Sequence, residues 1–435
     1  MGDAVADFEH LRDSGLLDEL VRKGALLPVF DVDSMSARQL ATALPPGALL
    51  VRQLALPFVS YPYEWPFGML QAAALLHLDL IESALDHDLM VKDASAYNIQ
   101  FDGTHPVFID LGSFERYAVG RPWRGYAQFC NLFLNPLLID ALAQFHFQPW
   151  LRSSLEGIPA DVTGRMLPIR AKVRRGVFLN VVLQALLGSR FRSATPAELG
   201  VTPNVKKRSI IKNVRHLREL ISSLRVSRTL SSWTDYEDTN SYSAEARSRK
   251  SAFVDAAVAS ARPAVVWDIG SNQGEYAFIA ARHAKTVVAI DADAGVVERL
   301  YQRARDANAC VLPLVMDLRN PSPDQGWDQR ERAGLASRGP ADIVLALAIV
   351  HHLRLGGNVP LRLLVRWLAR IGRRCVIEFV PKSDPQVRRL LAWRDDVYDD
   401  YDESGFEAAL NEGFAIEEKC RLPDSERVLY SARAR

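Results

Sequence analysis

From residue 263 onward, short apolar runs alternate with amphipathic segments. The runs 264–270 and 286–291 have the length and composition of buried strands, whereas the segment 295–307 has the apolar period of a helix. Strands and helices in such strict alternation fold into a parallel sheet that helices cover on both faces. We therefore predict an α/β domain here, with its ligand at the carboxyl ends of the strands.

The whole chain is too long for one core, because 435 residues at roughly 150 per domain give two or three domains. Its formal net charge of +1 gives no global attraction to nucleic acid or anionic lipid. The four cysteines lie far apart without a CxxC pair, which argues against a zinc site and indicates a reducing compartment. The apolar stretch 132–145 contains Asn135, Pro136 and Asp140, and is too short and too polar to span a bilayer. With no secretory signal core at the N-terminus either, we expect a cytoplasmic protein.

We predict three regions along the chain. Residues 1–192 mix strand-like and helical runs, residues 193–232 form a basic helical linker, and residues 233–435 form the α/β domain. Within the linker, the stretch 206–228 has apolar residues at helical spacing and cations mostly on the other face. The simpler interpretation is a connecting helix with a solvated basic face, and the alternative is a site for RNA or a membrane surface. The cations are Lys206, Lys207, Arg208, Lys212, Arg215 and Arg218.

The first strand of the α/β domain leads into a turn with an acid and two glycines. A dinucleotide fingerprint needs three glycines, but Asn272 stands at the second position counted from Gly270, and Glu275 stands at the third. Asp268 at the strand end would also repel a diphosphate. A nicotinamide dehydrogenase is therefore disfavoured. A ligand with cationic groups, such as S-adenosylmethionine, would be attracted by the same carboxylate.

Two further acids end the next two strands. Asp291 can accept hydrogen bonds from both hydroxyls of a ribose, and Asp317 can accept one from an adenine amino group. The alternative is that each of the three acids only caps a helix or a turn. Because all three occur at strand ends in register, we favour a common nucleoside pocket.

With these acids in order, residues 233–435 resemble the class I S-adenosylmethionine-dependent methyltransferases, which have a Rossmann-like seven-stranded sheet. The resemblance implies S-adenosyl-L-methionine as cofactor, with Asp291 at the ribose and Asp317 at the adenine. It also implies that the turn after the first strand holds the methionine part, although Asn272 departs from the commoner second glycine of the family. The cofactor-binding residues so predicted are Asp268, Gly270, Ser271, Asn272, Gly274, Asp291, Asp317 and Leu318.

Paired histidines, His351 and His352, follow the fourth strand, where the substrate-facing loop of that family lies. An imidazole can take the proton of a hydroxyl as it attacks a methyl group, so we predict O-methylation with one of the two as catalytic base. The alternative is a hydrogen-bonded structural pair. No NPPY-like motif accompanies them, which disfavours methylation of an amide or base nitrogen. Glu378 and Lys382, after the next strand, are secondary candidates for substrate contacts.

The segment before the first strand contains Trp233, Tyr236, Tyr242 and Lys250, and can fold over the cofactor to exclude water. Packing of an entry helix is the simpler role for most of them. The stretch 392–406, rich in acids and aromatic residues, is predicted to be an exposed loop or a lid.

In the front region, Asp93, Asn98 and Asp110 have the spacing of a phosphotransfer site. They resemble the catalytic loop and metal-binding acid of protein-kinase-like and aminoglycoside-phosphotransferase-like folds, which implies Asp93 as base and the other two as magnesium ligands. A glycine-rich phosphate loop is missing, and Arg52 stands where a lysine is expected. We therefore predict an α+β kinase-like domain that is degenerate and presents the substrate, with Mg-ATP as cofactor only if this domain is active.

As a whole, the chain resembles a bacterial family of two-part methyltransferases that includes nodulation-type proteins thought to modify glycans. We predict a methyltransferase that O-methylates a glycan or a small metabolite. The alternatives are a bifunctional kinase–methyltransferase and an RNA-binding methyltransferase that uses the stretch 206–228.

Overall fold

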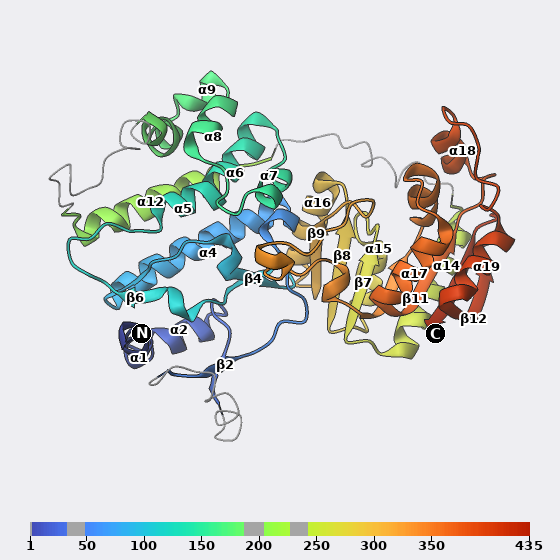
Figure 1. The fold of residues 1–435 in the computed structure, drawn as a ribbon, viewed down its shortest axis with the longest axis horizontal. Helices are drawn as coiled ribbons and strands as arrows, with labels where there is room; N and C mark the ends of the chain where they lie inside the picture. Colours follow the sequence, from blue (N-terminus) through green and yellow to red (C-terminus); the bar gives the residue numbers. More distant parts are fainter. Residues whose placement is uncertain (1, 33–47, 187–203, 227–241) are drawn as a thin grey trace. The chain divides into compact units, whose positions relative to one another are not determined.

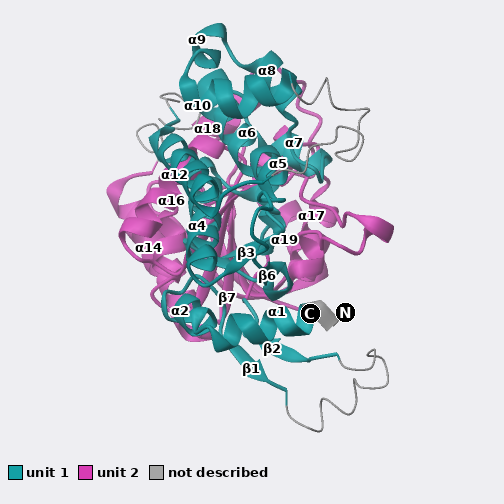
Figure 2. Ribbon diagram, turned by 90° about the vertical axis from the view of Figure 1, so that its left-hand side faces the viewer, with its two compact units in different colours: residues 1–56, 60–228 teal, residues 57–59, 229–435 magenta. Residues whose placement is uncertain are grey.

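The computed structural model describes residues 2–32, 48–186, 204–226 and 242–435 (Figure 1). The chain divides into two compact units, which Figure 2 shows in different colours. Unit 1 comprises Met1–Leu56 and Ser60–Arg228, and unit 2 comprises Pro57–Val59 and Thr229–Arg435. The short stretch Pro57–Val59 belongs to unit 2 because Phe58 packs edge-on against Trp267 of its sheet.

Unit 2 is built on one seven-stranded sheet with the order β12-β13-β11-β10-β7-β8-β9. Neighbouring strands from β11 to β9 are parallel, whereas β13 lies antiparallel between β11 and β12. The apolar runs of the sequence form these strands. Their bounds are β7 (Val265–Ile269), β8 (Thr286–Asp291), β9 (Val311–Val315), β10 (Ala341–Ala346), β11 (Gly372–Phe379), β12 (Phe414–Arg421) and β13 (Val428–Ala434).

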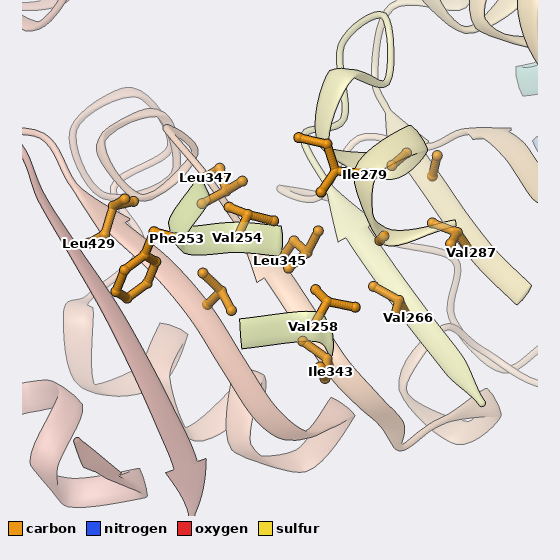
Figure 3. Packing of buried hydrophobic residues seen from close by; sticks show 14 of the residues in the cluster. Phe253, Val254, Val258, Val266, Ile279, Val287, Ile343, Leu345, Leu347 and Leu429 are labelled. Carbon is orange, nitrogen blue, oxygen red and sulfur yellow. The ribbon is translucent and has the colours of Figure 1, made fainter. Parts of the chain in front are cut away.

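Helices cover the sheet because the strands are apolar on both faces. The central strand β7 is buried at four of its five positions and β8 at five of six. Buried side chains of α14, α15 and α16 belong to the cluster that packs on the sheet. Figure 3 shows Val254 of α14 and Ile279 of α15 in this cluster with Val266 of β7. The helices of unit 2 are α14 (Ala244–Ala261), α15 (Glu275–Ala280), α16 (Ala294–Asp306), α17 (Leu361–Ile371), α18 (Pro385–Leu391) and α19 (Glu403–Gly413).

The order of the strands creates a switch point. From β7 the chain adds β8 and β9 on one side, and then returns to add β10 and β11 on the other. At such a point the loops after β7 and β10 diverge, and a crevice opens at the carboxyl ends of the strands. The three acids and the two histidines predicted from the sequence lie at or just after the carboxyl ends of β7, β8, β9 and β10.

Unit 1 combines helices with two-stranded ladders. The long helix α4 (Phe67–Asp86) is rich in apolar residues, and most of its inward positions are fully buried. β3 pairs antiparallel with β6, and β4 pairs antiparallel with β5. The other elements of unit 1 that bear on the argument are α1 (Gly2–Asp13), α2 (Leu16–Arg22), β1 (Val29–Asp31), β2 (Val51–Gln53), β3 (Leu89–Val91), β4 (Ile99–Asp102), β5 (His105–Phe108), β6 (Phe114–Arg116), α8 (Ala160–Met166), α9 (Ile169–Lys172), α10 (Arg175–Val177) and α12 (Lys207–Ser223).

Within the segment 193–232, which was predicted to be a basic linker, the described residues 204–226 contain the helix α12, and this helix belongs to unit 1. Its apolar stripe, Ile210, Val214, Leu217 and Ile221, is buried, and α12 packs against α4. Its basic face is partly neutralised by acids of unit 1. Lys207 Nζ lies 3.0 Å from Asp88, Arg215 pairs with Glu82, and Arg218 pairs with Asp79 and Glu82. The physical reason for the difference is that an amphipathic helix needs an apolar partner, and α4 provides one.

None of the helices in the described part of the chain combines the length and the apolar character needed to cross a membrane.

Candidate functional site

A cavity of about 340 Å³ lies in unit 2 at the carboxyl ends of β7, β8, β9 and β10. Such a volume falls within the range of pockets that bind cofactors. Of the eight predicted cofactor-binding residues, the cavity is lined by Asp268, Gly270, Ser271, Asn272, Asp291, Asp317 and Leu318. Most of the other residues that line the cavity were not predicted from the sequence. They include Arg247, Tyr276, Met316, Arg319, Leu347, Ile349, Leu353, Leu390 and Arg394.

The turn after β7 has a backbone that few residues can adopt. Gly270 has φ 77°, and a Cβ there would lie 2.9 Å from Cδ1 of Ile349. Asn272 has φ 47°, which asparagine tolerates better than most residues, so an asparagine can stand where the related family commonly has glycine. Gly274 does not line the cavity. It is the N-cap of α15 at φ 83°, where a Cβ would lie 2.4 Å from Cδ1 of Leu300.

Buried polar atoms in the turn have unused hydrogen-bonding capacity. Oδ2 of Asp268, Oγ of Ser271 and Oδ1 of Asn272 have no hydrogen-bond partner among residues 2–32, 48–186, 204–226 and 242–435. Burial raises the pKa of Asp268 to about 7; Lys250 lowers it and Asp291 raises it further. Because unsatisfied buried polar atoms are costly, these three fit a ligand that brings both donors and positive charge.

Asp291, at the end of β8, links the turn after β7 to the turn after β8 through hydrogen bonds. One carboxylate oxygen accepts from the backbone N–H of Asn272 at 2.9 Å, and the other accepts from that of Asp293 at 3.0 Å. Burial raises the pKa of Asp291, while these backbone hydrogen bonds lower it. Each carboxylate oxygen has a second lone pair, so both can still accept from a diol in the cavity.

Asp317 follows β9, and its carboxylate is already paired. The guanidinium of Arg319 donates to both oxygens, with Nη2 2.8 Å from Oδ2 and Nε 3.0 Å from Oδ1. This hydrogen bonding lowers the pKa of Asp317. The acceptor predicted for an adenine amino group is therefore already bound by a guanidinium, and Arg319 lines the cavity beside it.

The two histidines after β10 are not equivalent. His352 lines the cavity, and burial lowers its pKa to about 4, with Arg319 contributing. His351 is fully buried outside the cavity lining, and its ring centroid lies 4.1 Å from that of His352. Neither ring nitrogen of His351 has a hydrogen-bond partner in the part of the chain that the structure describes. The structure therefore brings one histidine of the predicted pair, His352, to the cavity, because consecutive side chains at the start of a helical turn point in different directions.

Lys250 enters the cavity from α14 as part of a buried ionic network. Its Nζ lies 2.8 Å from Oε2 of Glu378 and donates to the hydroxyl of Tyr242, which itself donates to Glu378 Oε1 at 2.6 Å. Arg427 joins with Nη1 3.6 Å from Glu378 and Nε 2.8 Å from Asp384. Burial is the largest single influence and disfavours the Lys250 ammonium, but the charge of Glu378, its hydrogen bond and Tyr276 together outweigh burial and raise the pKa of the lysine. Burial is also the largest single influence on the Glu378 carboxylate, but the charges of Lys250 and Arg427, with the hydrogen bonds from Lys250 and Tyr242, together outweigh it and lower the pKa of Glu378.

The secondary candidates have structural roles. Glu378 is fully buried in this network and does not line the cavity, so its predicted contact with substrate is corrected. Lys382 does not line the cavity either, because its ammonium pairs with Asp396 at 2.7 Å. In the stretch 392–406, Arg394 is the residue that reaches the cavity. Of the entry segment, Tyr242 and Lys250 line the cavity, whereas Trp233 and Tyr236 lie outside the described residues.

In unit 1, two of the three phosphotransfer candidates meet. Asn98 Nδ2 donates to Asp110 Oδ2 at 3.2 Å, and the hydroxyl of Ser113 donates to the same oxygen. Asp93 instead accepts from the backbone N–H of Ser95 at 3.0 Å. The described residues contain no group of three or more His, Cys, Asp and Glu side chains placed to hold a metal ion.

One prediction concerns Asp291 and its contact with the ribose of the donor. Asp291→Ala is expected to weaken binding of S-adenosylmethionine by about 1.5–3 kcal/mol, because hydrogen bonds from the ribose to a charged acceptor are lost. Isothermal titration calorimetry measures the effect. Asp293→Ala is a matched control, because Asp293 caps α16 through Gly295 and Val296 and does not line the cavity. The control should lower the free energy of unfolding by about 0.5–2 kcal/mol with donor affinity kept. An unchanged affinity in Asp291→Ala would remove the ribose assignment.

A switch-point pocket rimmed by strand-end acids is a ligand site of the kind that parallel α/β sheets form, at the edge of the sheet where the sequence predicted one. The chain belongs to the family of the nodulation protein NoeA. It is 36% identical over 433 residues to NoeA of Rhizobium meliloti (strain 1021), which covers 99% of this chain and 90% of that protein. No protein-family model matches the chain.

Two solved structures similar to part of the chain are methyltransferases of low sequence identity. N-methyltransferase NodS from Bradyrhizobium japonicum WM9 is 14% identical with a TM-score of 0.33, over 43% of this chain and 96% of that one. Magnesium protoporphyrin IX methyltransferase (ChlM) from Synechocystis PCC 6803, with bound SAM, is 20% identical with a TM-score of 0.30, over 44% of this chain and 82% of that one.

Proposed function

We propose that unit 2 transfers a methyl group from S-adenosylmethionine to a hydroxyl of a glycan or a small metabolite. When bound, S-adenosylmethionine supplies an electrophilic methyl group on a positively charged sulfur. The observation that carries the proposal is the set of three unpartnered buried atoms on Asp268, Ser271 and Asn272 in the described part of the cavity. They are two acceptors and a hydroxyl, which suit the ammonium group of a methionine moiety.

In this proposal, different residues that line the cavity contact different parts of the donor. Asp268 accepts hydrogen bonds from a cationic group, and Asp291 accepts from ribose hydroxyls. Met316, Leu318 and Leu347 supply apolar walls for a purine ring. The ammonium of Lys250 gives the cavity a positive charge, which suits the carboxylate of the donor.

His352 is the residue proposed to accept the proton of the acceptor hydroxyl. Its lowered pKa of about 4 keeps the imidazole neutral at physiological pH, and a neutral imidazole has one ring nitrogen that can accept a proton. The name of the relative places that protein in nodulation, and it supports a glycan as the acceptor only through the family resemblance.

Donor binding is expected to depend on pH through Asp268. A carboxyl with a pKa of about 7 in the free protein is protonated below that pH, and it must ionise to bind a cation. Affinity should therefore fall as pH decreases, by about tenfold between pH 8 and pH 6, and protons should be released on binding at pH 7. Calorimetry in buffers of different ionisation enthalpy measures both quantities.

The variant Asp268→Asn tests whether ionisation of Asp268 causes this pH dependence of donor binding. The amide cannot ionise, so the variant should bind about 10- to 100-fold more weakly at pH 8 and should lose the pH dependence below it. Lys250 and Asp291, the charged groups facing Asp268, are unchanged in the variant. Titration with NAD is the counter-test: tighter binding of NAD than of S-adenosylmethionine would overturn the proposed function.

The assignment of unit 1 as a kinase-like, substrate-presenting domain stays a prediction. The direct contact between Asn98 and Asp110 favours it. Magnesium-dependent ATP turnover that is lost in Asp110→Ala would establish phosphotransfer, and absence of turnover in the unchanged protein would dismiss it.

A further inference from the structure

A surface of unit 1 combines exposed apolar side chains with arginines. It spans α8, α9, α10 and the turn after them, which lie together at one end of unit 1 (Figures 1 and 2). Ile169 is 80% exposed and Val173 is 75% exposed, while Phe178 and Leu179 are 45% and 44% exposed. We call this surface the basic-apolar patch, which consists of Arg165, Ile169, Arg170, Val173, Arg174, Arg175, Phe178 and Leu179.

The exposure of these side chains is fixed by the packing of their neighbours. Leu167 and Ala171 are each 2% exposed, and Val177 is fully buried. They anchor the same short helices from the inner side, so the outer side chains cannot turn inward to reach the core. Large apolar groups held in water in this way are unfavourable, and a cluster of them marks an interaction surface.

The charge of the patch is strongly one-sided. From residue 162 to residue 186 the sequence has five cations and no acid. Arg165 pairs with Asp161 at 3.3 Å, but Arg170, Arg174 and Arg175 form no ion pair within the described ranges. The patch therefore differs from α12, where Lys207, Arg215 and Arg218 are neutralised by neighbouring acids.

We propose that the basic-apolar patch docks the protein on a bilayer surface that contains anionic phospholipids. The arginines suit lipid phosphates, and Ile169, Val173 and Phe178 suit the boundary between headgroups and acyl chains. Nucleic acid would engage the arginines but would leave the exposed isoleucine and valine in water. The membrane is therefore the partner that satisfies both halves of the patch.

Sedimentation of the full-length protein with vesicles tests the proposal. The protein should sediment with vesicles of phosphatidylcholine that contain about a quarter phosphatidylglycerol, and should stay in solution with pure phosphatidylcholine. Binding should weaken as salt increases, because the lipid charge is screened.

Two variants test the two halves of the patch separately. Arg170→Gln/Arg174→Gln/Arg175→Gln should lower the vesicle partition coefficient by about 100-fold, at about fivefold for each cation. Ile169→Ser/Val173→Ser keeps the charge and should lower it by about tenfold. All five side chains are exposed, so melting temperatures should stay close to that of the unchanged protein.

A matched control removes the same charge elsewhere. Lys206→Gln/Arg208→Gln/Lys212→Gln changes three exposed cations at the start of α12 and should leave vesicle binding within about twofold. Equal losses in the two triple variants would overturn the proposal, and so would failure of the unchanged protein to bind anionic vesicles at low salt. Retention of RNA that depends on the patch, without vesicle binding, would assign the patch to nucleic acid instead.

Discussion

His352→Ala is expected to lower kcat for methyl transfer by about 10²- to 10⁴-fold, with the donor Kd kept within about twofold. His352 is the histidine that lines the cavity, and its pKa of about 4 makes it a neutral proton acceptor across physiological pH. Transfer of label from radiolabelled donor into a cell extract provides the rate, and calorimetry provides the Kd. Because the imidazole is already deprotonated, kcat should show no titration of His352 between about pH 6 and pH 8.

His351→Leu is the control for this prediction. His351 is fully buried with neither ring nitrogen hydrogen-bonded within the described residues, so leucine removes two unsatisfied polar atoms and keeps an apolar volume. This variant should keep most of the turnover and gain about 1 kcal/mol in the free energy of unfolding. If His351→Leu and His352→Ala lost turnover equally, the base would have to be assigned elsewhere.

Glu378→Ala is expected to lower the free energy of unfolding of unit 2 by about 3–5 kcal/mol. Glu378 is fully buried, and its removal leaves Lys250 and Arg427, which are 2% and 1% exposed, without their shared carboxylate. Urea denaturation monitored by tryptophan fluorescence measures the loss. Donor affinity should fall as well, because Tyr242 and Lys250 line the cavity and both are held by Glu378.

Glu417 on β12 provides the surface comparison. It pairs with Arg374 at 2.7 Å, but about a third of each side chain is exposed, so water screens the pair. Glu417→Ala should cost less than about 1 kcal/mol. In the double variant Glu378→Ala/Lys250→Met, part of the lost stability should return, because the lysine no longer needs a counter-charge. Additive losses in that double variant would contradict a direct interaction.

Much of unit 2 can be predicted from the sequence because local periodicity sets its elements. The runs 264–270 and 286–291 became β7 and β8, and the helical segment 295–307 became α16. What periodicity cannot supply is the order of strands, in particular the insertion of β13 between β11 and β12. The place of α12, which lies within the segment 193–232 predicted to be a linker, could not be predicted for a related reason. An apolar stripe reveals that a helix needs a partner, but not that α4 is that partner.

In the candidate site, too, some residues can be predicted from the sequence and others cannot. Strand-end acids can be located from the sequence because the ends of parallel strands meet at one edge of the sheet. Arg319 was missed because its bidentate contact with Asp317 depends on the path of a turn. Lys250 and Glu378, 128 residues apart, carry no local signal that they pair. The two histidines could not be told apart, because the direction of each side chain depends on where the turn after β10 begins.

The position of β13 also affects how the chain can fold during synthesis. β12 leaves the ribosome before β13, which pairs with it and separates it from β11. Until residues 428–434 follow, β11 and β12 each present an open edge that could recruit another nascent chain. Glu417, Glu418 and Lys419 place charges along β12, which disfavours such pairing during the delay.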